Sequence, residues 1–107
     1  MRVLIVDDEE VICSGLKTLT EHLELSQVTS VDTITDPVAA LAAIRDDPPD
    51  IVMTDIKMPS LSGLELMERV RSQAPAVRFI VISGHDEFHL VRQALKQQAT
   101  DYLLKPA

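Results

Sequence analysis

Short apolar runs alternate with amphipathic stretches along this whole 107-residue chain, and that alternation limits the fold more than any other feature. The apolar runs have the length of strands, and one has the partly polar alternation of an edge strand. The expected strands are Val3–Val6, Gln27–Thr35, Ile51–Asp55, Val77–Ile82 and Tyr102–Leu104. Because a helical pattern and short connections separate successive strands, parallel pairing with right-handed crossovers is expected. The sequence therefore predicts a doubly wound α/β fold around one sheet.

Four helices are predicted from helical spacing and from capping residues. They start near Glu9, at Pro37 after the N-cap Asp36, after Ser62 with a capping-box Glu65, and after the N-cap Asp86; the first runs to about Leu23. The residues expected to face the core are Val11, Ile12, Leu16, Leu19 and Leu23, then Val38, Leu41 and Ile44, then Leu66, Met67 and Val70, and finally Phe88, Val91, Ala94 and Leu95.

Composition and charge are those of one folded, acidic domain. Hydrophobic residues make up 46% of the chain, which at this length is enough for one core and too little for two. The net charge of −7 has the wrong sign for gripping a nucleic acid or an anionic membrane. The single cysteine, Cys13, excludes an internal disulfide and favours a reducing, cytoplasmic setting. We therefore expect a soluble protein that binds neither DNA nor membranes directly.

Polar residues end or follow four of the five expected strands. Because parallel strands end at one edge of a sheet, Asp7, Asp8, Asp55, Ser83 and Lys105 are expected to converge there. Three crowded carboxylates must take up a proton, pair with a cation or bind a metal, and oxygen ligands favour Mg²⁺. Taken singly, the acids are helix caps or turn residues, the serine a turn residue and the lysine a solvated charge. Only their joint placement favours a site.

Four short motifs lie on these elements in a fixed order. They are Val-Asp-Asp at 6–8, Asp-Ile-Lys-Met-Pro at 55–59, Ser-Gly at 83–84 and Asp-Tyr-Leu-Leu-Lys-Pro at 101–106. With these motifs nearly the whole chain resembles the response-regulator receiver domain of two-component signalling. The resemblance implies a flavodoxin-like five-stranded parallel sheet in the order 2-1-3-4-5, which is the order of the chemotaxis member of the family.

The resemblance also implies a role for each site residue. Asp55 would be the phosphoacceptor, with a sensor histidine kinase as donor. Mg²⁺ would be held directly by Asp8, Asp55 and the backbone carbonyl of Lys57, and through water by Asp7. Lys105 would place a positive charge, and Ser83 a hydroxyl, beside the phosphoryl oxygens. Such a domain promotes its own phosphorylation and dephosphorylation and is not an enzyme with a separate substrate.

Signalling by this family implies a switch and an output. Ser83 would move toward the phosphoryl group and Tyr102 would follow, which changes the surface of strand four, helix four and strand five. That surface would control an output domain, which we expect to be transcriptional. The run Ser-Gly-His-Asp-Glu-Phe at 83–88 looks like receivers joined to AraC-type DNA-binding domains.

The end of the chain departs from the family pattern. Receivers normally continue into a fifth helix, whereas this sequence stops at Ala107. We interpret residues 1–107 as a receiver domain that lacks its C-terminal helix, and we expect apolar surface beside the first helix to be uncovered. A partner chain, as in a homodimer, exchanged elements or crystal contacts would then cover that surface.

Three other functions compete with this interpretation. A phosphatase of the haloacid dehalogenase type needs an acid two residues after its nucleophile, where this chain has Lys57. A flavin-binding electron carrier needs a loop rich in Ser, Thr and Gly after the first strand, where this chain has Asp7 and Asp8. A degenerate receiver that only mediates protein contacts would not need all five site residues. The phosphoacceptor remains the favoured function.

Overall fold

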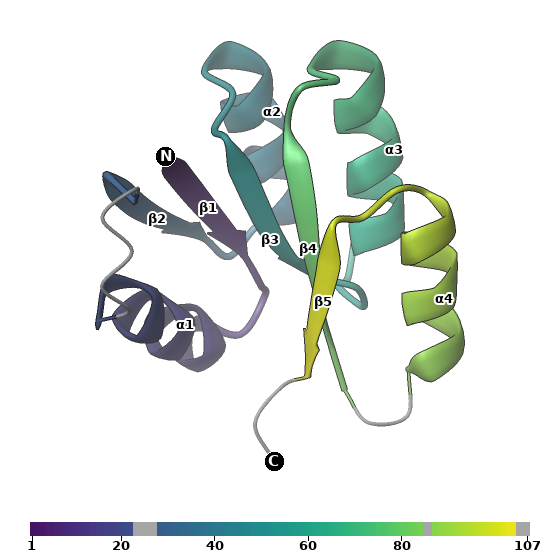
Figure 1. The fold of residues 1–107 in the computed structure, drawn as a ribbon, viewed down its shortest axis with the longest axis horizontal. Helices are drawn as coiled ribbons and strands as arrows, with labels where there is room; N and C mark the ends of the chain where they lie inside the picture. The colour runs from purple at the N-terminus through teal and green to yellow at the C-terminus, as the bar shows by residue number, and fades with distance from the viewer. Residues whose placement is uncertain (23–27, 85–86, 105–107) are drawn as a thin grey trace.

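The computed structural model describes residues 1–22, 28–84 and 87–104, and strands and helices alternate along them (Figure 1). The elements are β1 (Arg2–Val6), α1 (Glu10–His22), β2 (Ser30–Ile34), α2 (Pro37–Asp46), β3 (Ile51–Asp55), α3 (Gly63–Gln73), β4 (Arg78–Ser83), α4 (Phe88–Lys96) and β5 (Asp101–Leu104). Each predicted element is present, with ends that differ by a few residues at most from those expected. Within the described residues no helix has the length and apolar character needed to cross a bilayer.

The strands form one parallel sheet in the order β2-β1-β3-β4-β5, which confirms the expected topology. Figure 1 shows α1 on one face of the sheet and α2, α3 and α4 on the other. The chain winds outward from β1 to β2 and then returns past β1 to β3. The topological switch point therefore lies between the carboxyl ends of β1 and β3, where open α/β sheets bind their ligands.

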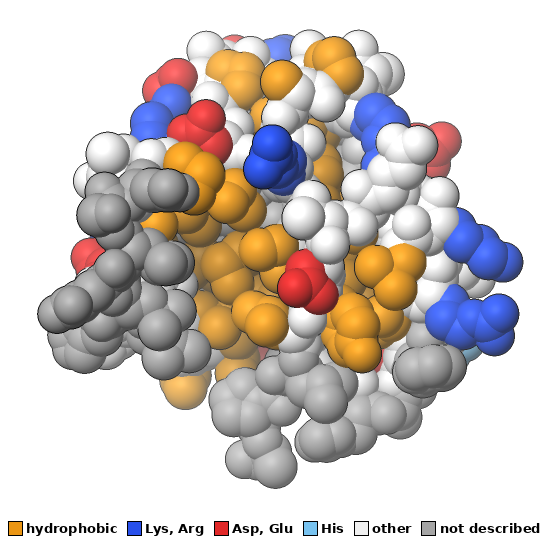
Figure 2. All heavy atoms as spheres, in the orientation of Figure 1, with side chains coloured by type: hydrophobic (Ala, Val, Ile, Leu, Met, Phe, Trp, Pro, Cys, Tyr) orange, Lys and Arg blue, Asp and Glu red, His pale blue; other side chains and the backbone are white. Residues whose placement is uncertain are grey.

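The core is aliphatic and has two parts, one on each face of the sheet. The larger part joins the sheet to α2, α3 and α4, and includes Met58 and Met67. The smaller part lies under α1 and contains Cys13 and Met53. Figure 2 shows hydrophobic side chains at the surface on the α1 side of the sheet. Leu103 in β5 is 40% exposed.

Two predicted helix caps are present. The Oδ1 of Asp36 accepts a hydrogen bond from the backbone N–H of Val38 at 3.0 Å, and Pro37 is the first residue of α2. The hydroxyl of Ser62 accepts from the N–H of Glu65 at 3.2 Å and so caps α3. The third predicted cap, Asp86, lies outside the described residues, and Glu87 takes the N-cap position of α4.

Three residues predicted to face the core are instead exposed, and these predictions were wrong. Val11 is 82% exposed, Val38 55% and Leu95 42%. In each of these helices the buried face includes a small residue, and predictions based on large apolar side chains give such residues little weight. These residues are Cys13 in α1, Ala40 in α2 and Ala94 in α4. A shift of the stripe by one or two residues turns the neighbouring large side chain toward solvent. Leu23 and the side chains of Leu19 and Phe88 lie outside the described part of the chain.

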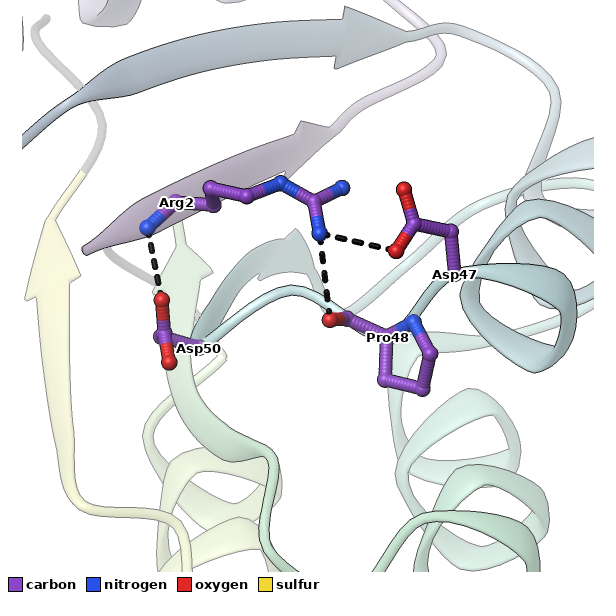
Figure 3. A network of polar contacts seen from close by, with 4 residues as sticks. All are labelled: Arg2, Asp47, Pro48 and Asp50. Atoms are coloured by element: carbon purple, nitrogen blue, oxygen red, sulfur yellow. Dashed lines mark hydrogen bonds and ion pairs between the residues drawn. The ribbon is translucent and has the colours of Figure 1, made fainter.

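A polar network at the amino-terminal edge of the sheet ties β1 to the α2–β3 connection (Figure 3). The guanidinium of Arg2 contacts the carboxylate of Asp47 at 2.9 Å and the carbonyl of Pro48 at 3.4 Å. The backbone N–H of Arg2 donates to Asp50 at 2.7 Å. These groups are exposed, so the network links β1 to the start of β3 but adds little stability.

Candidate functional site

Three carboxylates meet at the switch point. Asp7 follows β1 and Asp55 ends β3, and the register that pairs Val6 with Thr54 brings these two acids side by side. One carboxylate oxygen from each of Asp7, Asp8 and Asp55 lies within 4.8 Å of the others. Asp7 is 0% exposed and Asp55 1%, whereas Asp8 is exposed. The predicted convergence of these acids is therefore present in the structure.

Short contacts hold Asp7 at this edge. Its Oδ1 accepts a hydrogen bond from the N–H of Glu9 at 2.9 Å, which turns the chain into α1. Its own N–H donates to the carbonyl of Ile34 at the end of β2, at 3.3 Å. The thiol of Cys13 donates to the carbonyl of Asp7 at 3.3 Å. Burial, and then the charge of the nearby Asp7 carboxylate, raise the pKa of that thiol. The thiol therefore stays protonated and available as a donor.

Backbone hydrogen bonds to α3 and β4 fix Ile56, the residue that follows Asp55. The N–H of Gly63 donates to the carbonyl of Ile56 at 2.7 Å, and the N–H of Ile56 donates to the carbonyl of Ile82 at 3.2 Å. Gly63 has no side chain at the point where α3 meets the end of β3, and a Cβ atom there would overlap the carbonyl oxygen of Asp55. The start of α3 thus packs directly on the backbone of the central acid.

The loop between β3 and α3 is compact and strained. Met58 and Leu61 are buried and anchor it in the core, while the Lys57 side chain is exposed. The N–H of Leu61 donates to the carbonyl of Pro59 at 2.8 Å, and Ser60 between them has a φ of 71°. A γ-turn with positive φ is rare and strained for a residue with a side chain. Such strain is typical of loops whose shape serves a site.

Ser83 brings a hydroxyl to the same edge. It ends β4 one residue beyond Ile82, the partner of Asp55 in the sheet, and it is 0% exposed. Within the described residues its Oγ has no hydrogen-bond partner. A buried hydroxyl without a partner is costly, so this group is suited to a ligand that arrives at the edge.

Two other predicted site residues remain, Lys105 and Tyr102. Lys105 lies outside the described residues. Tyr102 pairs with Val81 in the sheet and is 40% exposed, so its ring lies at the surface beside β4. Sequence reasoning also missed Gly63, which lets α3 pack on the backbone of Asp55. Its position as the second residue of a capping box is its only sign in the sequence.

The acidic cluster fits a hard divalent cation. Its donors are all carboxylate oxygens, two of its members are buried, and their mutual repulsion is relieved when a cation binds. Mg²⁺ prefers such oxygen ligands, and it needs few from the protein because it retains water. The residues present therefore suit the metal that the sequence predicted.

A model of the family described as the response regulator receiver domain matches residues 3–107. The chain belongs to this family. Its relatives include the transcriptional regulatory protein YesN of Bacillus subtilis, which is 37% identical over 105 residues, and HptR of Staphylococcus aureus, which is 33% identical over 105 residues. These matches cover 98% of this chain but only 28% and 40% of the respective relatives. The receiver therefore corresponds to a minor part of each longer regulator.

Solved structures agree with this assignment. A response regulator receiver domain protein from Clostridium thermocellum superposes with a TM-score of 0.85 and 30% identity, over 99% of this chain and 82% of that one. The receiver domain of AraT, a response regulator from Geobacillus stearothermophilus, gives a TM-score of 0.82 and 34% identity, over 99% and 81%. The chain is thus a receiver domain of a two-component response regulator, with transcriptional regulators among its relatives.

Proposed function

We propose that this receiver accepts a phosphoryl group on Asp55 from a sensor histidine kinase, in a reaction that depends on Mg²⁺. The observation that carries the proposal is the meeting of three carboxylates at the switch point, with the buried Asp55 among them. A carboxylate at the end of a buried strand, beside a cation site and a buried hydroxyl, is suited to attack phosphorus.

In the proposed transfer an oxygen of Asp55 forms a new bond to phosphorus. The bond from phosphorus to the kinase imidazole breaks, and its electron pair stays on that nitrogen. Asp8, Asp55 and the carbonyl of Lys57 would hold Mg²⁺ directly, and Asp7 would act through water. The metal, when bound, neutralises the charge that gathers between the carboxylates and the phosphoryl oxygens.

Two further residues complete the proposed site. Ser83 would donate its buried hydroxyl to a phosphoryl oxygen, and Lys105 would supply a positive charge. Tyr102, which is 40% exposed, would turn inward as Ser83 moves, and the surface of β4, α4 and β5 would change. That surface is the proposed contact with an output domain, whether of the AraC type or another, and with a second copy of the chain in a homodimer.

The extent of the domain and the cellular location of the protein are also proposals. We propose that residues 1–107 form one receiver domain that lacks the C-terminal helix usual in the family. The partly exposed apolar side chains beside α1 in Figure 2 support this view. We also propose that the protein acts in the cytoplasm, where its single cysteine stays reduced.

Intact mass after incubation with acetyl phosphate and Mg²⁺ tests the proposal. Wild type should gain one phosphoryl group, Asp55→Asn should gain none, and the matched control Asp32→Asn should behave as wild type because Asp32 is exposed on β2. If wild type gains no mass under conditions that phosphorylate another receiver, the proposal is wrong and a receiver that only mediates protein contacts is left.

A further inference from the structure

Glu87 is a largely buried carboxylate that reaches back from the start of α4 to the end of β4. It is 9% exposed, and its Oε2 accepts a hydrogen bond from the N–H of Gly84 at 2.9 Å. The N–H of Glu87 donates in turn to the carbonyl of Gly84 at 3.3 Å. No ion pair of the described residues includes Glu87. A buried negative charge needs such donors, so this pair of bonds holds the two residues together.

The same residue begins α4. Glu87 occupies the N-cap position, yet its side chain makes no capping bond to the helix. Its carbonyl accepts from the N–H groups of Leu90 and Val91 at 3.0 and 3.1 Å, and Val91 is buried in the core. Glu87 therefore holds the end of β4 with its side chain and the first turn of α4 with its backbone.

Gly84 shares a peptide unit with Ser83, whose buried hydroxyl has no hydrogen-bond partner in the part of the chain that the structure describes. If the backbone of Ser83 shifts as its hydroxyl reaches a ligand, this peptide unit moves with it, and the bond from Gly84 to Glu87 stretches or carries Glu87 along. We propose that Glu87 is a positioning residue that holds Ser83 in the resting receiver and transmits its displacement to α4. The resting contact is independent of phosphorylation, whereas the trigger rests on the proposed function of Asp55.

Hydrogen exchange in the unphosphorylated protein tests the resting contact. In Glu87→Ala the Gly84 amide should exchange at least about tenfold faster than in wild type, the factor expected when a charged hydrogen bond is lost. Glu87→Gln keeps an oxygen acceptor and should restore most of the protection. The amide of Val81, within β4, should stay protected in all variants, which shows that they remain folded. Unchanged exchange at Gly84 in a folded Glu87→Ala protein overturns the inference.

Amide chemical shifts of α4, followed together with intact mass, test the transmission. In wild type and Glu87→Gln the amides of Leu90, Val91 and Ala94 should shift on addition of acetyl phosphate and Mg²⁺. In Glu87→Ala the protein should gain the same mass while these shifts fall to less than half. A full α4 response in phosphorylated Glu87→Ala overturns the inference. If wild type itself gains no mass, the proposed function has failed, and the exchange at Gly84 still decides whether Glu87 holds β4.

Discussion

Gly63 and Asp55 touch through their backbones, and the contact leaves no room for a side chain on Gly63. A Cβ atom there would overlap the carbonyl oxygen of Asp55 and would lie 3.0 Å from the Cα of Ile56. Both neighbours are backbone atoms, which cannot turn aside as the end of a flexible side chain can. The position of α3 and the position of the proposed phosphoacceptor are therefore set by the same contact.

Gly63→Ala should push α3 and the end of β3 apart. We expect a loss of about 1–3 kcal/mol in the free energy of unfolding, the usual cost of overpacking, together with slower phosphorylation of Asp55. Urea denaturation and the rate of mass gain measure the two effects. Gly15→Ala is the matched control, because nothing lies within 4 Å of a Cβ atom at Gly15 in α1. Alanine should raise stability there by about 0.5–1 kcal/mol. Equal effects at both glycines would contradict the role of the contact.

Mg²⁺ should stabilise the domain through the acidic cluster. At a concentration about 100 times its Kd, a ligand of the folded state adds about 2.7 kcal/mol to the free energy of unfolding. Thermal unfolding of wild type should therefore shift upward with Mg²⁺ and return with a chelator. Asp8→Asn should lose most of this shift, yet without metal it should be at least as stable as wild type, because one of three repelling charges is gone. Asp32→Asn should keep the full shift. An equal Mg²⁺-dependent shift in Asp8→Asn would show that Mg²⁺ does not bind at the acidic cluster.

The buried thiol of Cys13 should make stability depend on pH above neutrality. Its pKa in the folded state is raised above the usual 9.0, so the folded state binds this proton more tightly than the unfolded state. The corresponding contribution to stability is present below pH 9.0 and is lost as pH rises through the folded pKa. Denaturation of wild type and Cys13→Ser across this range measures it. The advantage of wild type should shrink with rising pH, and a constant difference would contradict the assigned direction.

The end of α4 contains strain that glycine should relieve. Gln98 has a φ of 70°, and the N–H of Ala99 donates to the carbonyl of Ala94 at 3.0 Å across it. This is the left-handed helix terminus at which glycine is favoured. Gln98→Gly should raise the free energy of unfolding by about 1 kcal/mol. Gln93→Gly, within the same helix, should lower it by about 1 kcal/mol. A loss of stability in both variants would show that Gln98 is not strained.

The sequence predicted what depends on strand ends and local caps. Each expected apolar run forms a strand in the structure. The sequence alone could therefore place the acids that follow β1 and end β3 at one edge of the sheet. Asp36 and Ser62 cap their helices because a cap involves only residues near one another in the chain. The strand order came from the resemblance to the family.

Other features depend on contacts that the sequence does not display. The rotation of α1, which exposes Val11 and buries Cys13, is set by how the helix lies on the sheet. The fit of Gly63 on Asp55 depends on the separation of α3 from β3. In the sequence, Glu87 looks like any acid at the start of a helix. Only the structure shows that its carboxylate accepts a hydrogen bond from the N–H of Gly84.

Mapping the phosphoryl group tests the central claim most directly. Borohydride reduces an aspartyl phosphate to homoserine, and peptide mass spectrometry then reports the position of the change. After incubation of wild type with acetyl phosphate, we expect homoserine at position 55 when Mg²⁺ is present and almost none when a chelator replaces it. Homoserine at another position, or equal amounts with and without Mg²⁺, would contradict a magnesium-dependent phosphoacceptor at Asp55.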